Sequence, residues 1–163
     1  MGEPFFTPGV PLVLDLRANP GGFLDQAVAV ASIFVDRGVV VSIEGAHQAR
    51  RVYTVSGKPG TRLPVVVLVD RVTASSAEVV AAALHEHGRA RLVGERTFGK
   101  ALVQSVVPLA NGAALKLTTA HYLTPGGFDI SRNGVVPDVF AADDPHTPRD
   151  EGLDAALRAL LSS

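Results

Sequence analysis

The sequence predicts an α/β fold: one domain in which a mixed sheet is flanked by helices and carries an added β-hairpin. Three observations support this prediction. Short valine-rich runs alternate with stretches of helical periodicity. An Asn-Gly pair separates two strand-like runs in the second half of the chain. The length of 163 residues suits a single domain with one substantial core.

The first half of the chain alternates short strands with a helix. Leu12 to Leu16 is predicted as a buried strand, which the turn residues Asn19 to Gly22 bring to an end. Apolar residues recur at helical spacing from Phe23 to Phe34, and we expect Gly38 to cap that helix. Further strands are predicted at residues 39–43, 52–55 and 65–69, and the last, wholly apolar run should be a central strand.

The second half begins with a predicted helix from Ser75 to His87, closed by Gly88. A short strand should follow at 91–94. Residues 103–108 and 114–122 should then pair as a hairpin across Asn111-Gly112. After a polar, proline-containing linker at 143–150, regularly spaced leucines and alanines from Leu153 to Leu161 predict a final amphipathic helix.

Composition narrows the functional classes. A formal net charge of −1 gives no electrostatic reason to expect nucleic acid as a partner. The sequence contains no cysteine, which excludes disulfides and thiol chemistry. Its apolar runs are far shorter than the roughly 20 residues of a membrane-spanning helix. Residues 1–9 lack the basic start and apolar core of a signal peptide, so we expect none in this chain.

Ser75 is the first candidate for chemistry. It follows a predicted buried strand and opens a helix, where free backbone N–H groups and the helix dipole favour a developing oxyanion. The alternative is purely structural. Ser75 would then cap the helix, and Glu78, three residues later, would complete a capping box. The local pattern alone favours the structural interpretation, because serine-rich helix starts are common and most of them catalyse nothing.

A nucleophilic serine needs a base, and two kinds of residue are candidates. Lys100 follows a short strand in a glycine-containing turn with apolar neighbours, and Gln104 could orient its amine. A lysine that acts as a base near neutral pH must be desolvated, because its ordinary pKa is about 10.4. Taken alone, the local pattern favours an ordinary, solvated surface lysine. The histidines are scattered and lie in no recognisable triad pattern: His47, His85, His87, His121 and His146.

Two other patterns are coincidental. Gly94 to Lys100 matches the first seven positions of a phosphate-binding loop, but Ala101 replaces the magnesium-binding hydroxyl residue, and a strand rather than a helix follows. His85 and His87 stand two apart on a helix and therefore point in different directions, which argues against a metal pair. Neither pattern therefore predicts a metal or an organic cofactor.

Taken together, four segments in order resemble the carboxyl-terminal processing proteases, also called tail-specific proteases. The resemblance covers Leu12 to Asp138, most of the chain. The segments are Leu14 to Arg17 with Asn19 to Gly22; Thr73 to Glu78; Gly94-Glu95 with Thr97 to Lys100 and Val103-Gln104; and Tyr122 to Gly126 with Gly134 and Val136 to Asp138.

The resemblance implies a role for each matching residue. Ser75 would be the nucleophile, Lys100 the general base, and Gln104 the residue that orients the lysine. The backbone amides of the Gly21-Gly22 turn and of Ser76 would form the oxyanion hole. The implied fold is crotonase/ClpP-like, which agrees with the alternation of strands and helices.

The chain also departs from the family pattern. Ser76 and Ala77 stand where the family usually has Ala then Ser, and Ala101 replaces a usual glycine. Gly127 and Phe128 replace a usual polar run. The family normally carries a PDZ domain and a helical region upstream. We therefore expect residues 1–163 to form a single serine protease core domain without the PDZ domain.

The function predicted first is a serine endopeptidase that cleaves proteins near exposed C-terminal tails. The resemblance further implies a location outside the cytoplasm, in the periplasm or cell envelope, and is compatible with a homo-oligomer. One alternative is a non-catalytic binding module on the same fold, like the family's retinoid-binding relatives. Others are a latent core that needs missing domains, and a histidine-based esterase.

Overall fold

The computed structural model describes residues 9–46, 48–131 and 133–162. It confirms the predicted α/β fold, with its strands divided between a parallel and an antiparallel sheet. In chain order the elements are β1 (Leu12–Asp15), α1 (Leu24–Phe34), β2 (Val39–Gly45), β3 (Gln48–Thr54), β4 (Val65–Val69), α2 (Ser76–Glu86), β5 (Ala90–Gly94), β6 (Leu102–Pro108), β7 (Ala114–Leu123), β8 (Val139–Phe140) and α3 (Glu151–Leu161).

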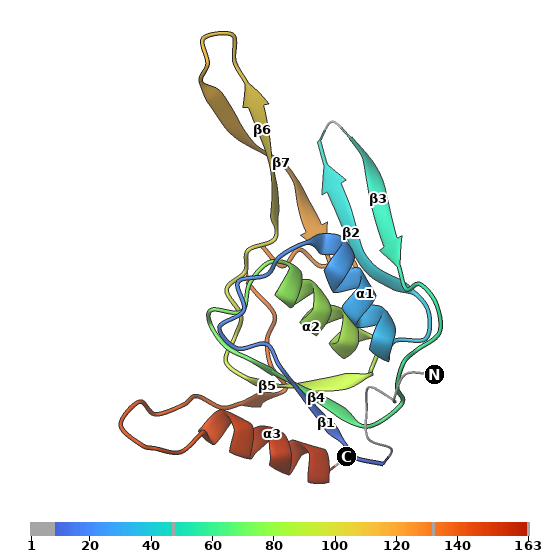
Figure 1. Ribbon diagram of the computed structural model, residues 1–163, viewed down its shortest axis with the longest axis vertical. Helices are drawn as coiled ribbons and strands as arrows, with labels where there is room; N and C mark the ends of the chain where they lie inside the picture. Colours follow the sequence, from blue (N-terminus) through green and yellow to red (C-terminus); the bar gives the residue numbers. More distant parts are fainter. Residues whose placement is uncertain (1–8, 47, 132, 163) are drawn as a thin grey trace, which may run out of the picture.

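The parallel sheet has the strand order β1-β4-β5-β8. All five residues of β4 are buried, which confirms the prediction of a central strand. Val65, Val67 and Val69 belong to the core cluster shared with α1 and α2. Val66 and Leu68 pack with alanines of α3 on the opposite face. The strand is apolar throughout because helices cover both faces of its sheet (Figure 1).

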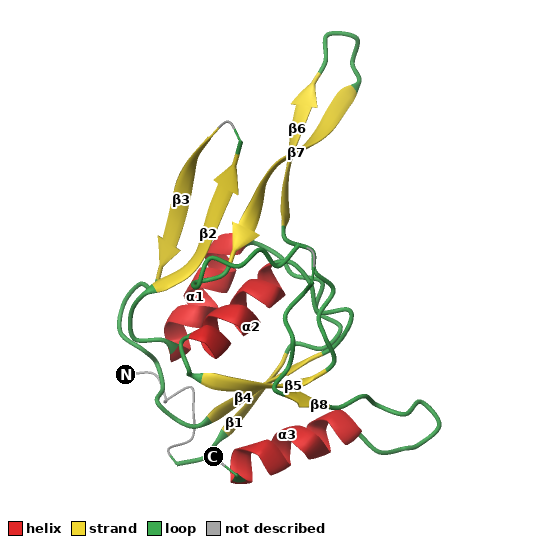
Figure 2. Cartoon of the chain, turned by 180° about the vertical axis from the view of Figure 1, so that it is seen from behind, coloured by secondary structure: helices red, strands yellow, loops and turns green. Residues whose placement is uncertain are grey.

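Helices α1 and α2 lie between the two sheets (Figure 2). Helix α2 is buried at every position from Ser76 to Leu84. Its small alanine side chains let the helix backbone approach its neighbours closely, and it contacts both β2 and β5. The burial fixes the position of the residues at its N-terminus, where Ser75 lies.

The antiparallel sheet has the order β3-β2-β7-β6. Strands β6 and β7 form the predicted hairpin, whose turn contains Gly112 with a φ of 81°. This hairpin projects from the body of the molecule (Figure 1). The strand that follows Lys100 also confirms that Gly94 to Lys100 does not lead into the helix of a phosphate-binding loop.

The predicted bounds of α1, β2 and β3 were wrong. Helix α1 ends at Phe34, because Val35 is already extended, so Gly38 does not cap it. Gly38 instead turns the chain into β2 with a φ of 116°, and the imidazole of His87 lies against its α-carbon. Strands β2 and β3 extend further into the predicted polar loop. The exposed charged residues Arg50 and Arg51 led to the prediction of a loop. They are compatible with β3 because it is an edge strand, on which charged side chains can point into solvent.

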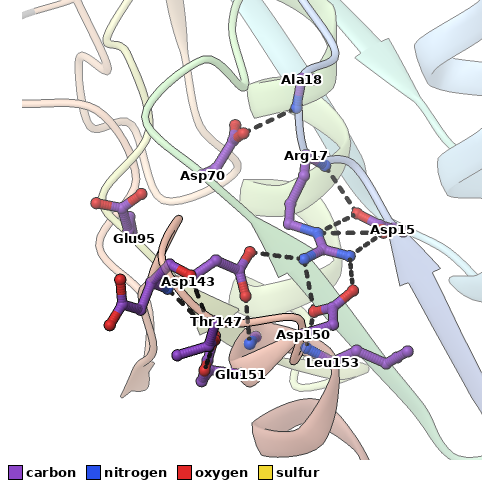
Figure 3. Close-up of polar contacts among 12 residues, drawn as sticks. Asp15, Arg17, Ala18, Asp70, Glu95, Asp143, Thr147, Asp150, Glu151 and Leu153 are labelled. Atoms are coloured by element: carbon purple, nitrogen blue, oxygen red, sulfur yellow. Dashed lines mark hydrogen bonds and ion pairs between the residues drawn. The ribbon is translucent and has the colours of Figure 1, made fainter.

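Arg17, just after β1, joins that strand to the start of α3 (Figure 3). Its guanidinium bonds both oxygens of Asp150 at 2.8 and 2.9 Å and also reaches Asp15 and Asp143. Hydrogen bonds to Asp15 and Asp150 raise the pKa of Arg17 above its ordinary value. Asp150 is the N-cap of α3 and accepts the N–H of Leu153. One guanidinium therefore holds α3 against the end of β1.

The pH dependence of stability tests this contact. The bond from Arg17, and then that from the Leu153 N–H, hold the pKa of Asp150 below its usual value. The stabilisation is therefore present above the unfolded pKa of about 3.9 and is lost as the pH falls through the lower folded value. We expect Asp150→Asn, which preserves the cap, to lower the free energy of unfolding by about 1 kcal/mol at pH 7.

Urea denaturation of both proteins from pH 7 to pH 3 measures this difference. It should shrink below about pH 4, because the carboxylate of the unfolded wild type then takes up a proton, and it should disappear only as the pH falls through the lower folded pKa. Arg149→Gln, which removes an exposed ion pair on the same segment, is the control and should change the free energy by less than about 0.5 kcal/mol. A difference that does not depend on pH would contradict the interpretation.

Candidate active site

Three loops meet at one edge of the parallel sheet. They span residues 16–22, residues 70–75 (the serine loop) and residues 95–101 (the lysine loop), and they follow β1, β4 and β5 respectively. These strands are parallel neighbours, so their carboxyl ends lie side by side. That edge is where open α/β sheets place their ligands. The loops contain all the predicted site residues except Ser76, which begins α2, and Gln104, which lies on β6.

Ser75 has a backbone conformation that helix capping does not require. Its φ and ψ are 56° and −123°, whereas an ordinary N-cap residue is extended with a negative φ. Such a conformation costs about 1–3 kcal/mol in a residue with a side chain, and strain of this kind clusters at active sites. A strained serine in a sharp turn from strand to helix is the arrangement of a nucleophile elbow. Ser75 is also partly exposed to solvent and is therefore not fully buried in the core.

The Gly21-Gly22 turn lies directly against Ser75. A β-carbon on Gly21 would lie 2.7 Å from the Ala74 oxygen, 2.8 Å from the Ser75 β-carbon and 2.9 Å from the Ser76 nitrogen. Gly21 also has a φ of 91°. Only glycine satisfies both conditions. The predicted oxyanion residues are therefore brought together with Ser75.

The amides of this turn are engaged by neighbouring side chains. The Gly21 N–H donates to Asn19 Oδ1 at 2.9 Å, and the Gly22 N–H donates to Ser76 Oγ at 2.6 Å. The Asn19 carbonyl in turn accepts the N–H of Ala74. The turn is thus fastened to the serine loop by backbone and side-chain bonds.

Glu78 connects the serine loop to the lysine loop. Its carboxylate is fully buried and accepts four hydrogen bonds. One comes from the Ser75 N–H at 2.9 Å, as a capping box requires. The donors from the other loop are the Thr97 hydroxyl at 2.5 Å, the Gly99 N–H at 2.7 Å and the Lys100 N–H at 2.8 Å.

The two remaining predicted residues occupy exposed positions. The backbone of Lys100 is fixed through its N–H to Glu78, while its side chain is exposed. Gln104 lies on β6 next to an irregularity in the pairing with β7, and its side chain is also exposed. The structure therefore fixes where the lysine loop lies and leaves the lysine amine at the surface.

Sequence reasoning missed Asp70, which shapes the serine loop. Its carboxylate accepts the N–H groups of Ala18, Val72 and Thr73. Burial opposes its ionisation, but the backbone bonds from Ala18 and Thr73 outweigh that effect and lower the pKa of Asp70. Asp followed three residues later by Thr directly after a strand is a turn signal that could have identified it.

A cavity of about 210 Å³ lies beside the Gly21-Gly22 turn. Ser76 also lines it. Its remaining walls are largely aliphatic and aromatic, formed by Leu16, Phe23, Ala27, Val30, Ala77 and Val80 among others. An apolar cavity of this kind can receive an apolar side chain.

The histidines that the structure describes are not bonded to Ser75. No hydrogen bond joins any of them to Ser75 within the ranges that the structure describes. His85 bonds Asp138 at 3.0 Å near the far end of α2, roughly 13 Å along the helix from its first residue. His87 bonds the Val39 carbonyl, His121 is on β7, and His146 precedes α3. His47 lies outside the described residues.

Comparison with known proteins identifies the family. The sequence matches the family described as peptidase family S41 over residues 10–141. The chain belongs to peptidase family S41. The S41 match includes all three loops and the C-terminal segment at 134–138, where Val135 exchanges hydrogen bonds with Thr97 and so supports the lysine loop.

Individual S41 relatives agree with this assignment. A carboxy-terminal-processing protease of Bartonella bacilliformis is 42% identical over 89% of this chain and 34% of its own length. A chloroplastic C-terminal processing peptidase of Tetradesmus obliquus is 47% identical over 93% and 32%. The solved photosystem II D1 C-terminal processing protease superposes with a TM-score of 0.77 at 44% identity, over 92% of this chain and 38% of that one.

The chain spans about a third of the length of these curated relatives. The solved tricorn protease, at 21% identity and a TM-score of 0.63, shares the fold. In the described part of the chain, no helix is both long and apolar enough to cross a membrane. Nor do three or more potential metal-binding side chains gather among those residues.

The close approach of Gly21 predicts different effects for the two glycines of the turn. Gly21→Ala should lower the free energy of unfolding by about 2–4 kcal/mol, because it combines a positive φ with a backbone clash. Gly22→Ala should lower it by less than about 1 kcal/mol, because no atom lies within 4 Å of the added carbon. Thermal and urea unfolding measure both. Equal effects would show that the turn does not touch Ser75 as described.

The role of Glu78 predicts a large effect for Glu78→Gln. An amide offers one acceptor oxygen and turns an NH₂ group toward the donors, so the free energy of unfolding should fall by about 2–4 kcal/mol. Glu86→Gln on the same helix is the control. Glu86 is exposed and accepts one amide, so its change should stay within about 1 kcal/mol in the same unfolding experiment. Similar losses for both variants would argue against the role given to Glu78.

Proposed function

We propose that this chain is the catalytic core of a serine endopeptidase of the carboxyl-terminal processing type. The observation that carries the proposal is the strained conformation of Ser75, held against the Gly21-Gly22 turn and tied through Glu78 to the loop of Lys100. Family membership supplies the reaction class, peptide-bond hydrolysis.

In the proposed reaction, Ser75 Oγ attacks the scissile carbonyl carbon and transfers its proton to the neutral Lys100 amine. The carbonyl oxygen becomes an oxyanion that accepts hydrogen bonds from the amides of Gly21, Gly22 and Ser76. The Lys100 ammonium then protonates the leaving amine, and the C–N bond breaks. Water, deprotonated by the lysine, hydrolyses the acyl-enzyme and restores Ser75. Gln104 orients the lysine amine.

The exposure of Lys100 adds a requirement to this mechanism. A lysine base functions near neutral pH only where water is excluded from it. We infer that bound substrate, or a part of the protein beyond these residues, covers Lys100 before acylation. In the isolated chain, Ser75 would then react only to the extent that a bound substrate or probe excludes water from the Lys100 amine.

The substrates that fit are proteins or peptides with an exposed, unstructured C-terminal tail. An extended tail can reach the loops at the sheet edge and place one side chain in the apolar cavity beside Gly22. The relatives include bacterial and chloroplastic processing proteases. On that basis we propose action outside the cytoplasm, in the periplasm or cell envelope.

A non-catalytic binding module on the same fold is the second candidate, and the apolar cavity is the observation that favours it. A binding module needs neither a strained serine nor the carboxylate that ties it to the lysine loop. Such a module would bind its ligand equally well after Ser75→Ala and would not react with serine-directed reagents.

Reaction with a fluorophosphonate probe tests the proposal. The wild-type protein should form an adduct at Ser75, and Ser75→Ala should abolish it. Lys100→Ala should slow labelling by at least about 100-fold, consistent with the loss of a general base, and Gln104→Ala by about tenfold. Lys116→Ala, which removes an exposed lysine from the β6–β7 hairpin, is the matched control and should label normally. Equal labelling of all variants would exclude the Ser-Lys mechanism, while sensitivity to a histidine substitution instead would favour an esterase.

A further inference from the structure

The side chain of Ser76 occupies a backbone donor of the candidate site. Ser76 directly follows the proposed nucleophile and begins α2, and the residue is only 8% exposed. Its Oγ accepts the Gly22 N–H at 2.6 Å, a short bond for a neutral donor and acceptor. Ser76 and Gly22 also line the same apolar cavity beside the site.

This bond competes with the reaction proposed above. The Gly22 N–H carries a single hydrogen, so it cannot fully serve both Ser76 Oγ and the oxygen of a tetrahedral intermediate. The other amide of the turn, that of Gly21, is bonded to Asn19 Oδ1. Both glycine donors of the turn are therefore engaged by side chains of the protein itself.

We propose that the Ser76 hydroxyl is an internal occupant of the oxyanion site and that it slows acylation of Ser75. This inference rests on the proposed function, in which the Gly22 amide binds the oxyanion. The hydroxyl keeps the donor satisfied when no substrate is bound, and it must rotate away from Gly22 before the donor can reach a substrate oxygen.

The energetics permit this exchange. Ser76 Oγ is a neutral acceptor, whereas the developing oxyanion is charged and makes the stronger hydrogen bond with an amide. The exchange therefore proceeds once substrate reacts. It is slowed because the existing hydrogen bond between the Gly22 N–H and Ser76 Oγ must first break. Alanine at this position removes the competing acceptor. The turn should keep its place in that variant, because Asn19 still bonds both Gly21 and Ala74.

The test compares second-order rates of fluorophosphonate labelling in wild type, Ser76→Ala and Ser76→Thr. Ser76→Ala should label about three- to tenfold faster, the effect of releasing one neutral hydrogen bond. Ser76→Thr retains a hydroxyl and should show no gain. Ser32→Ala is the matched control, because Ser32 is also a buried helical serine whose Oγ accepts a loop amide, from Ser56 at 3.1 Å. Ser32→Ala should label at the wild-type rate.

The outcomes separate this inference from the proposed function. If wild type labels at Ser75 and Ser76→Ala labels at the same rate or more slowly, the hydroxyl does not obstruct the site and the inference is overturned. An equal gain in Ser76→Ala and Ser76→Thr would also overturn it, because the hydroxyl would not be the cause. Labelling that persists in Ser75→Ala would instead overturn the proposed function.

Discussion

The buried carboxylate of Glu78 connects segments of the chain that are far apart in sequence. It accepts a hydrogen bond from the Ser75 N–H. It also accepts hydrogen bonds from the Thr97 hydroxyl and from the N–H groups of Gly99 and Lys100. A buried charge is stable only when its hydrogen-bonding capacity is filled. The serine loop and the lysine loop must therefore adopt these positions together. Together with the backbone hydrogen bond from the Phe98 N–H to the Thr73 carbonyl, this carboxylate fixes the serine loop relative to the lysine loop.

The core of the fold provides the rigidity that this arrangement needs. Helix α2 is buried along most of its length, between a parallel sheet and an antiparallel one, so its first turn cannot shift to relax Ser75. The Gly21-Gly22 turn closes against the same serine at distances that exclude a side chain. Strain of about 1–3 kcal/mol at Ser75 is thus balanced by packing elsewhere, as is typical of functional sites.

Much of the fold could be predicted because periodicity and turn chemistry are local. The buried strand β4, the Asn111-Gly112 hairpin and the Gly88 helix end followed from a few neighbouring residues. The end of α1 at Phe34 could not be predicted, since the extended conformation of Val35 is set by tertiary packing. Within the site, Ser75 and Lys100 came from ordered motifs. Their connection through Glu78 could not, because a capping-box glutamate gives no local sign of a second loop bonded to the same carboxylate.

The most direct test is a crystal structure of the protein after reaction with a fluorophosphonate. Ser75 Oγ should be bonded to phosphorus, and the phosphonyl oxygen should lie 2.7–3.1 Å from the turn amide of Gly22, with Ser76 Oγ rotated away from it. Glu78 should still bind both loops in the adduct. An adduct on another residue, or a phosphonyl oxygen directed away from the Gly21-Gly22 turn, would contradict the account.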